Sequence, residues 1–322
     1  MKPPLTRHLP EASRLALGCM GLGGPAEASP IAENHVAQAQ AALEAAREIG
    51  ITLFDHADIY RRGNAERVFG ELFRRQPSLR DGMVLQTKCG IRFADDAGPG
   101  RYDFSRAYIL AAVDASLARL QTDRIDILLL HRPDPLMEPD EVAEAFSRLR
   151  ASGKVRHFGV SNMRAGALRW LQQALDAPLV ANQIEMSLLA RSWLDQDTCF
   201  NDAQGAGGLG WSDTLQHCMA AGIQLQAWGP LAQGWLSGAL PGDAGAAVRD
   251  TAALVAEMAQ RHAVPRESIV LAWLLRHPAR IQPVIGTTQA ERIRACAAAT
   301  RVALSREEWY ALYVSARGRR LP

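Results

Sequence analysis

The chain is poor in the features that mark many classes of protein. Its 322 residues include only five cysteines, and no two of them form a Cys-x-x-Cys pair, so neither a disulfide framework nor a structural zinc site is indicated. No apolar run reaches the roughly 18 residues that cross a membrane, and residues 1–10 lack the apolar stretch of a secretory signal. We therefore expect reduced cysteines and a cytoplasmic protein with no membrane partner.

An excess of charge of one sign is also absent. The formal net charge is +2, and no stripe of lysine and arginine interleaved with aromatic residues is present, which argues against nucleic acid as a partner. The composition, 48% hydrophobic and 22% charged, is ordinary for a globular protein with a large core. No internal repeat or linker marks a boundary, so we expect residues 1–322 to form a single domain. The sequence leaves the oligomeric state open and is compatible with a monomer.

Short apolar runs alternate with helical stretches, as in repeated βα units. The expected strands are Leu15–Leu17, Ile51–Phe54, Met83–Thr87, Ile125–Leu130, Val155–Val160, Val180–Ile184, Ile223–Trp228 and Gln282–Ile285. The expected helices are Ala37–Ile49, Ala65–Arg75, Ser105–Leu120, Pro139–Ala151, Arg164–Leu175, Ser212–Ala221, Val248–His262, Glu267–His277, Ala290–Thr300 and Arg306–Ala316. Arg191–Gly210 is interpreted as an irregular loop. The pattern predicts a (β/α)8 TIM barrel with additional helices.

Polar or ionisable residues follow four of these strands, and a (β/α)8 barrel gathers such strand ends at one rim. Asp55 and Lys88 follow consecutive strands that lie side by side, so the carboxylate should keep the lysine protonated. Tyr60 lies in the loop after Asp55; its phenol, with an ordinary pKa of about 10, keeps its proton at neutral pH and suits a general acid beside an ammonium. His131 follows the next strand and can hydrogen-bond the same substrate oxygen. Together these groups suit protonation of an alkoxide.

Five motifs in order resemble the successive motifs of the aldo-keto reductases: Phe54–Tyr60, Gln86–Gly90, Leu130–Asp134, Gly159–Asn162 and Asn182–Glu185. The resemblance implies a barrel enzyme that reduces a small-molecule carbonyl substrate, an aldehyde or ketone, with NADPH and without a metal. It also implies four catalytic residues: Asp55, Tyr60, Lys88 and His131.

The resemblance further assigns residues to the nicotinamide end of the cofactor. Ser161, Asn162 and Gln183 would hold the carboxamide, which agrees with the presence of amide and hydroxyl groups at strand ends. Trp228 would stack on the ring, since an indole supplies a flat apolar face. We expect the loop after the seventh strand to wrap the pyrophosphate, with three candidate residues: Gly229, Leu231 and Gln233.

A phosphate site is expected after the eighth strand. Gly286, followed by Thr287 and Thr288 at a helix start, offers free backbone N–H groups to a phosphate. Thr288 and Glu291 also fit a capping box. The resemblance implies that Thr287 and Arg292 hold the 2'-phosphate, which favours NADPH over NADH.

Some residues depart from the family's pattern. Gly286 stands where many members have a lysine, and Cys296 where many have an asparagine. Arg61 and Arg62 stand in place of the usual glycine after the tyrosine. Their charge beside the pocket mouth could favour anionic substrates, but surface arginines at a helix start are more often merely solvated. In the loop after the fourth strand, Arg132 and Asp134 are interpreted as a structural pair.

Three other classes of function compete with carbonyl reduction. A metal-dependent barrel hydrolase would use Asp55, His56, Asp58, His131 and even Lys88 as ligands or as a modified bridging lysine. However, residues 55 and 56 should point to opposite sides of a strand, and no His-x-His ends the first strand. A class I aldolase would use Lys88 as a Schiff base, which requires a neutral lysine and conflicts with its pairing to Asp55. The third class is an accessory protein of the same fold that binds NADPH as a sensor, and the sequence does not exclude it.

Overall fold

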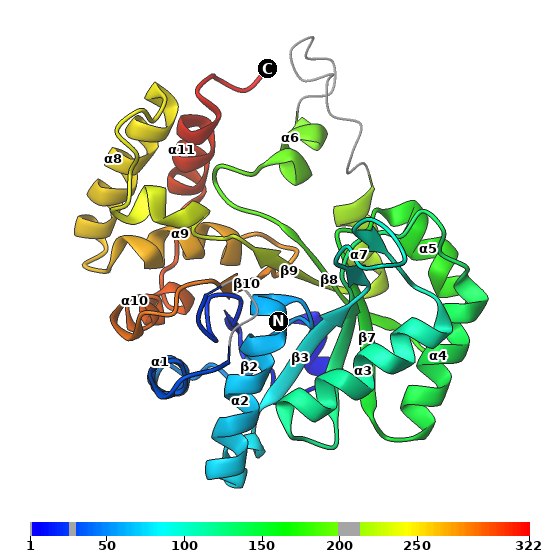
Figure 1. Cartoon of the computed structure of the whole chain (residues 1–322). Helices are drawn as coiled ribbons and strands as arrows, with labels where there is room; N and C mark the ends of the chain where they lie inside the picture. The colour runs from blue at the N-terminus through cyan, green and yellow to red at the C-terminus, as the bar shows by residue number, and fades with distance from the viewer. Residues whose placement is uncertain (1, 26–29, 199–212) are drawn as a thin grey trace.

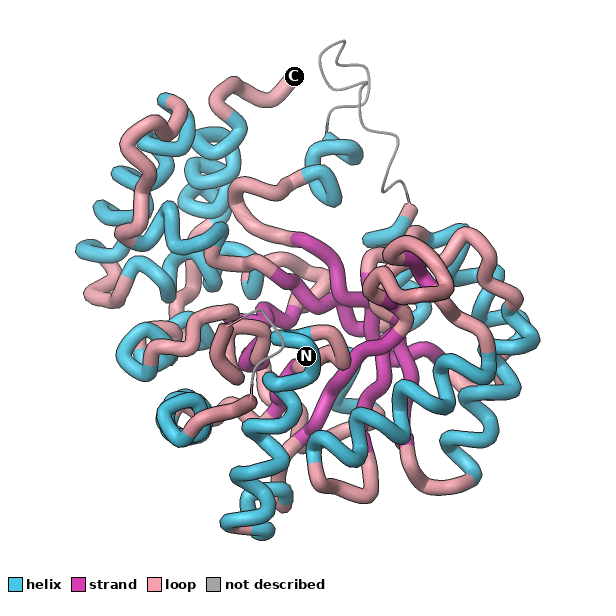
Figure 2. Tube along the Cα trace, viewed as in Figure 1, coloured by secondary structure: helices cyan, strands magenta, loops and turns pink. Residues whose placement is uncertain are grey.

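The computed structural model describes residues 2–25, 30–198 and 213–322 (Figure 1). Parallel strands close into a barrel in the order β1-β10-β9-β8-β7-β6-β3-β2, and Figure 2 shows this barrel with helices around it. The barrel strands are β1 (Ala16–Gly18), β2 (Leu53–Asp55), β3 (Val84–Cys89), β6 (Ile125–Leu130), β7 (Val155–Ser161), β8 (Leu179–Glu185), β9 (Gln224–Trp228) and β10 (Gln282–Ile285). The predicted (β/α)8 fold class is confirmed.

Side chains alternate between the lumen of the barrel and the surrounding helices. In β3, Val84 belongs to the inner apolar cluster, whereas Leu85 and Cys89 pack in the outer one, as the two-residue period of a strand requires. Cys89 therefore faces away from the lumen. The inner cluster fills the lumen toward the amino ends of the strands and consists of Leu5, Leu9, Ala12, Ala16, Leu53, Val84, Ile127, Leu129, Val180, Ala181 and Val284.

The helices surround the barrel (Figure 1). They are α1 (Glu33–Glu48), α2 (Asn64–Arg75), α3 (Arg106–Leu120), α4 (Pro139–Ala151), α5 (Ala165–Ala174), α6 (Ser192–Thr198), α7 (Thr214–Ala221), α8 (Ala246–Arg261), α9 (Arg266–Leu275), α10 (Ala290–Arg294) and α11 (Arg306–Arg317). Both α8 and α9 lie between β9 and β10 in the chain, and α8 packs against α9 and α11. One of these two helices is additional to a bare barrel, as the sequence predicts.

Two local predictions were wrong or incomplete. The expected loop Arg191–Gly210 contains helix α6, while its residues 199–210 lie outside the described part of the chain. Trp193 in this helix is buried and packs edge-on against Trp273 at 5.9 Å, so tertiary burial outweighs a weak local pattern. The sequence also gave no sign of the small antiparallel pair β4 (Ile91–Arg92) and β5 (Arg101–Tyr102).

Within the described ranges, no helix is both long and apolar enough to cross a membrane. The four cysteines in those ranges are free and buried: Cys19, Cys89, Cys218 and Cys296. Cys199 and the expected first residue of the sixth helix, Ser212, lie outside them.

Candidate active site

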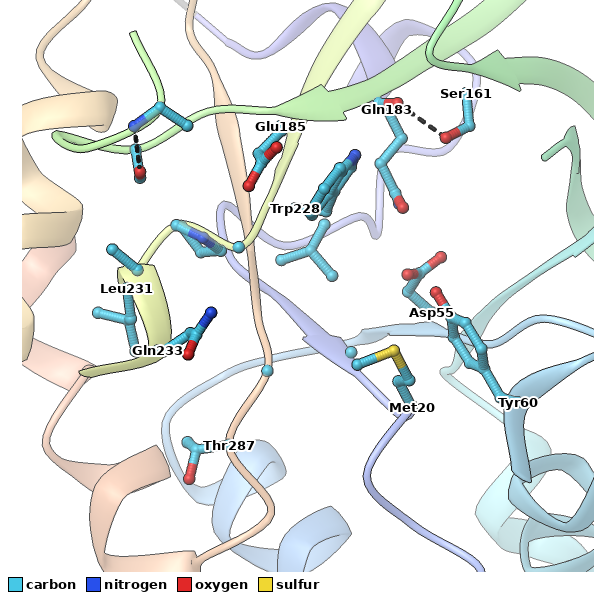
Figure 3. Close-up of a pocket in the computed structure, with 18 of the residues that line it drawn as sticks. Met20, Asp55, Tyr60, Ser161, Gln183, Glu185, Trp228, Leu231, Gln233 and Thr287 are labelled. Atoms are coloured by element: carbon cyan, nitrogen blue, oxygen red, sulfur yellow. Dashed lines mark hydrogen bonds between the residues drawn. The ribbon is translucent and has the colours of Figure 1, made fainter. Parts of the chain in front are cut away.

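A cavity of about 1220 Å³ opens at the carboxyl ends of the barrel strands. In Figure 3, Asp55 and Tyr60 lie on one side of it, Leu231 and Gln233 on the other, and Trp228 between them. Nearly all residues proposed from the sequence line this cavity: Asp55, Tyr60, His131, Ser161, Asn162, Gln183, Trp228, Gly229, Leu231, Gln233, Gly286, Thr287, Thr288 and Arg292. The exception is Lys88, which is fully buried behind the wall.

Lys88 connects two of the predicted side chains. Its Nζ donates hydrogen bonds to both carboxylate oxygens of Asp55, at 2.7 Å each, and to the backbone oxygen of His56 at 2.8 Å. The same Nζ is 3.1 Å from Tyr60 Oη. In the register of the neighbouring strands β2 and β3, Asp55 is opposite Gln86, and Lys88 lies two residues further along the same face of β3, within reach of the carboxylate. The structure therefore assembles carboxylate, ammonium and phenol as the sequence predicted.

Burial acts in opposite directions on the pKa values of Lys88 and Tyr60. It acts to lower the pKa of Lys88, but the Asp55 carboxylate and Tyr60 oppose it, and the net pKa is raised. For Tyr60, burial raises the pKa above its ordinary value and outweighs the nearby ammonium, which lowers it. At neutral pH the lysine is therefore charged and the phenol holds its proton.

His131 follows β6 and faces the phenol. Its ring lies edge-on to that of Tyr60, with 5.9 Å between the ring centroids. Burial, together with the charges of Lys88 and Arg132, lowers the pKa of His131 to about 2. The imidazole is therefore neutral at physiological pH, where it can hydrogen-bond an oxygen but is a poor source of protons. Of the two groups, Tyr60 is the better acid.

The turn after β2 carries Tyr60 over Lys88. The turn contains the short 3-10 helix η2 (Tyr60–Gly63). Within it, Arg61 and Arg62 have left-handed backbone conformations, with φ of 50° and 52°. Such a conformation costs about 1–2 kcal/mol in a residue other than glycine. Arg61 Nε donates to the backbone oxygen of Met20 at 3.1 Å, and the Arg62 guanidinium lies 4.4 Å from the Phe93 ring centroid. Both arginines line the cavity. Preference for anionic substrates stays a prediction.

Asp58 lies in the same turn and faces a second buried carboxylate. Burial, reinforced by Glu66, raises the pKa of Asp58 to about 7, against the lowering effect of Arg119. Its Oδ2 accepts a long hydrogen bond of 3.5 Å from Tyr108, and a hydrogen bond from the Ile59 backbone also lowers its pKa, but by less than burial raises it. The surroundings of Asp58 therefore stabilise its negative charge too little to offset the effect of burial.

We expect Asp58→Asn to stabilise the fold at about pH 8 by up to a few kcal/mol. In the unfolded chain Asp58 loses its proton near 3.8, whereas in the folded protein it holds the proton to about 7. Wild-type stability therefore falls as the pH rises between these values, and the variant escapes this loss. Thermal unfolding at several pH values measures the difference, with Asp96→Asn, an exposed aspartate, as the control. An advantage that is the same at acidic and alkaline pH would contradict this account.

The predicted carboxamide residues form one hydrogen-bonded group. Asn162 Nδ2 donates to Ser161 Oγ at 2.8 Å and to the backbone oxygen of His131 at 3.3 Å. Trp228 Nε1 donates to Asn162 Oδ1 at 3.1 Å, and Ser161 Oγ donates to the backbone oxygen of Gln183 at 2.9 Å. These bonds hold the indole at a fixed orientation against β7 and β8.

The segment after β9 meets α10 at the far end of the cavity. Gly229 and Gly234 have φ of 64° and 84°, and a Cβ on Gly234 would lie 2.8 Å from Arg292 Nη2. The left-handed φ favours glycine at both positions, and a side chain at position 234 would make the end of Arg292 shift. Arg292 is held by Ser237 Oγ at 3.3 Å and Glu267 Oε1 at 3.5 Å, which leaves its guanidinium at the cavity wall.

The predicted capping box at the start of α10 is wrong. The N-cap is Gln289, one residue beyond Thr288, and its side chain makes no capping hydrogen bond. Thr288 Oγ1 instead accepts a hydrogen bond from Gln38 Nε2 at 3.3 Å, and Thr287 Oγ1 accepts one from the Gln289 backbone N–H at 3.3 Å. Both threonines still line the cavity.

The predicted pairing of Arg132 with Asp134 is also wrong. The Arg132 guanidinium lies 5.7 Å from the ring centroid of Trp228. Asp134 accepts hydrogen bonds from the backbone N–H groups of Phe104 at 2.8 Å and Leu136 at 2.9 Å. These two backbone N–H groups use the carboxylate of Asp134. Arg132 does not pair with it and lines the cavity instead.

Sequence reasoning missed several other residues of the cavity wall. Met20 follows the end of β1, so the rule that strand ends gather at the rim could have found it. Glu185 is the last residue of the motif Asn182–Glu185, which the sequence already indicates. Phe93 follows β4, and Trp235 lies in the short 3-10 helix η4 (Ala232–Ser237); neither segment has a periodic signal in the sequence. The missed residues that line the cavity include Met20, Phe93, Arg132, Glu185 and Trp235.

His56 points away from Asp55, as strand alternation predicts. It is fully buried, and its ring packs edge-on against Phe69 with 4.4 Å between centroids. Within the described ranges, no group of three or more histidine, cysteine, aspartate or glutamate side chains is arranged to hold a metal ion.

A closed parallel barrel with a cavity at its strand ends, where ionisable and amide side chains meet, is an enzyme-like architecture. A sequence model of the "Aldo/keto reductase family" matches residues 14–313, and the chain belongs to that family. It is 39% identical over 314 residues to a 6-dehydroglucose reductase of Agrobacterium fabrum, covering 96% of each chain. It is 37% identical over 282 residues to the oxidoreductase YdhF of Escherichia coli, covering 87% of this chain and 88% of that one.

A solved structure agrees with this assignment. The aldo/keto reductase of Klebsiella pneumoniae, crystallised with NADP and acetate, is 27% identical. It superposes with a TM-score of 0.71, covering 94% of this chain and 90% of that one. The resemblance seen in the motifs is confirmed.

Proposed function

We propose that this protein reduces an aldehyde or ketone to an alcohol with NADPH, and that Tyr60 is the proton donor. The observation that carries the proposal is the 3.1 Å separation of Lys88 Nζ and Tyr60 Oη at the cavity wall, with Asp55 behind the lysine. Asp55 keeps Lys88 charged, and the Lys88 ammonium makes the phenolate left by proton transfer less costly. Family membership supports the same chemistry.

Each of the four residues has a distinct part in this mechanism. NADPH, when bound, supplies the hydride. Tyr60 gives its proton to the carbonyl oxygen, and Lys88 stabilises the phenolate that remains. The neutral imidazole of His131 hydrogen-bonds the same oxygen and fixes its position. Asp55 holds the lysine in place and charged.

The cavity fits an extended dinucleotide. It extends from Tyr60 past Trp228 to Leu231 and Gln233, and the Arg292 guanidinium also lines it. Gly234 leaves open the space beside Arg292 that a side chain would fill. The Klebsiella pneumoniae structure in complex with NADP supports this cofactor. We assign the nicotinamide to the end near Ser161, Asn162, Gln183 and Trp228, the pyrophosphate to Gly229–Gln233, and the 2'-phosphate to Gly286–Thr288 and Arg292.

The competing functions fit the geometry less well. An aldolase needs a neutral lysine, but the Lys88 ammonium is held by three oxygen atoms at 2.7–2.8 Å. A metal hydrolase needs His56 beside Asp55, and the imidazole lies on the opposite face of the strand against Phe69. An accessory NADPH-binding role would not require Tyr60 to lie against Lys88. A measurement of turnover distinguishes this role from carbonyl reduction.

A screen of NADPH oxidation tests the proposal. The panel should contain aromatic, aliphatic, sugar-derived and keto-acid carbonyls, each with NADPH and with NADH. The name of the Agrobacterium fabrum relative, a 6-dehydroglucose reductase, and the polar rim of Arg61, Arg62, Arg132 and Glu185 favour a hydroxylated aldehyde. We expect turnover at ordinary enzyme rates with at least one class. Tight NADPH binding without turnover of any carbonyl would favour the sensor role.

Arg292→Ala should weaken NADPH binding by about 10–100-fold and NADH binding by less than about threefold. The reason is that a guanidinium bonded to a phosphate is a charge-assisted contact, and only NADPH carries the 2'-phosphate. Fluorescence titration with both coenzymes measures the effect. Arg294→Ala is a matched control, because Arg294 lies on the same helix but pairs with Glu48 at 2.6 Å. Equal weakening of both coenzymes would refute the assignment.

A further inference from the structure

Four buried glutamines form a hydrogen-bonded chain across the barrel lumen, directly behind the active site. They are Gln86 on β3, Gln183 on β8, Gln226 on β9 and Gln282 on β10, each at most 2% exposed. Barrel lumens are usually filled with branched apolar side chains, and a buried amide is costly unless its hydrogen bonds are made. A row of amides at this level therefore requires an explanation beyond packing.

The chain begins at the carboxylate of Asp55. Gln86 Nε2 donates to Asp55 Oδ1 at 2.6 Å and to Gln226 Oε1 at 2.9 Å. Gln226 Nε2 returns a hydrogen bond to Gln86 Oε1 at 3.0 Å and donates its second hydrogen to Gln282 Oε1 at 2.9 Å. Gln183 Nε2 donates to Gln226 Oε1 at 3.1 Å. Both hydrogens and both lone pairs of the Gln226 amide are thus used.

This arrangement has only one possible orientation. The ionised Asp55 accepts hydrogen bonds and donates none, so the amide nitrogen of Gln86 must face it. The reciprocal pair then fixes Gln226, whose oxygen must accept from Gln183. As a result, Gln183 turns its nitrogen toward Gln226 and uses one of its hydrogens there, and its Oε1 is the acceptor left for the cavity. Gln183 lines the cavity, and Figure 3 shows its side chain extending into it beside Trp228, on the side of Asp55.

We propose that Gln86 and Gln226 are positioning residues. Because the Asp55 carboxylate only accepts hydrogen bonds, it fixes the orientation of the Gln86 amide, and through Gln226 that of the Gln183 amide. They make the cavity present a hydrogen-bond acceptor at the nicotinamide end, which selects a ligand that carries a donor there. Given the proposed function, on which this inference rests, that donor is the amino group of the cofactor's carboxamide. The same carboxylate that holds Lys88 would then also set the recognition of the cofactor.

A fifth lumen glutamine supplies a matched control. Gln224 is fully buried on β9, two residues before Gln226. Its Nε2 donates to the backbone oxygens of Leu225 at 2.9 Å and Arg280 at 2.8 Å, and it makes no hydrogen bond with the Asp55 chain among the residues that the structure describes. Replacing it removes a buried amide without breaking the path to Gln183.

The test compares NADP⁺ with its 3-acetylpyridine analogue, in which a methyl group replaces the carboxamide amino group. We expect wild type to bind NADP⁺ about tenfold more tightly, the effect of one lost hydrogen bond at a site that leaves an acceptor unpaired. Gln226→Met, close in volume to the original residue, should reduce this ratio to about two or less. Gln86→Met should reduce it in the same direction, while Gln224→Met should keep the wild-type ratio. Thermal unfolding of all variants shows how much stability each loses.

The ratio of the two affinities separates positioning from stability, because a merely structural role would lower the melting temperature without changing the ratio. A wild-type ratio near one would overturn the inference without any variant. A Gln226→Met protein that keeps the tenfold ratio would also overturn the inference. If that variant does not fold, Gln86→Met makes the same comparison. Wild type that binds neither dinucleotide would instead contradict the proposed function, so the two failures are distinguishable.

Discussion

Tyr60→Phe is expected to lower kcat for carbonyl reduction by about 10²–10⁴-fold, the range typical of a lost general acid. The change removes one oxygen atom, the one that lies 3.1 Å from Lys88 Nζ, and keeps the aromatic ring. NADPH affinity should change little, because the proposed cofactor contacts lie along β7, β8, β9 and α10. Steady-state kinetics combined with fluorescence titration of NADPH measure both quantities.

Tyr310→Phe is the matched control for this substitution. Tyr310 lies on α11, is 36% exposed, and does not line the cavity, so its loss should leave kcat unchanged. Full reductase activity in Tyr60→Phe would show that another group supplies the proton. A neutral His131, with its pKa near 2, is a poor candidate for that group.

Lys88→Met is expected to damage both the fold and the reaction. The ammonium donates to both oxygens of Asp55, and removing it leaves a buried carboxylate supported mainly by Gln86. Breaking a buried ion pair in this way costs about 3–5 kcal/mol. Turnover should fall by at least about 10²-fold, since Tyr60 loses the charge that stabilises its phenolate. Denaturant unfolding and steady-state kinetics measure the two effects.

The double variant Asp55→Asn with Lys88→Met separates these effects. Removing the carboxylate as well should recover much of the lost stability, because no unpaired charge remains buried. It should not recover turnover. If the double variant regained activity along with stability, the lysine would have served the fold alone.

The main features of the site could be predicted because they depend on local patterns with a geometric rule behind them. Asp55, Lys88 and His131 lie at or just beyond the ends of β2, β3 and β6, and parallel strands place such ends at one rim. The alternation of side chains also correctly separated Asp55 from His56 and turned Cys89 outward.

The remaining features depend on contacts between distant residues. The helix α6 forms because Trp193 is buried against Trp273, 80 positions away in the chain by their numbers. Arg132 lies over Trp228 because backbone N–H groups hold Asp134. Sequence patterns do not contain these partners.

The glutamine chain was visible in part. Gln224, Gln226 and Trp228 alternate along β9, and polar residues at this period in a strand indicate a polar face. Their partners come from β3, β8 and β10, so only the closed barrel shows that the amides meet. The capping box failed for a smaller reason: the N-cap lies one residue beyond Thr288, and helix boundaries are the least certain part of a pattern.

Transfer of deuterium from labelled cofactor tests the central claim most directly. NADPH carrying deuterium at one or the other C4 position of the nicotinamide would be incubated with an accepted aldehyde, and the alcohol analysed by mass spectrometry and NMR. The account predicts that one of the two labelled forms places its deuterium on the carbinol carbon, and that Tyr60→Phe forms almost none of this product. An alcohol without deuterium on that carbon from either form, or no alcohol from any carbonyl compound, would contradict it.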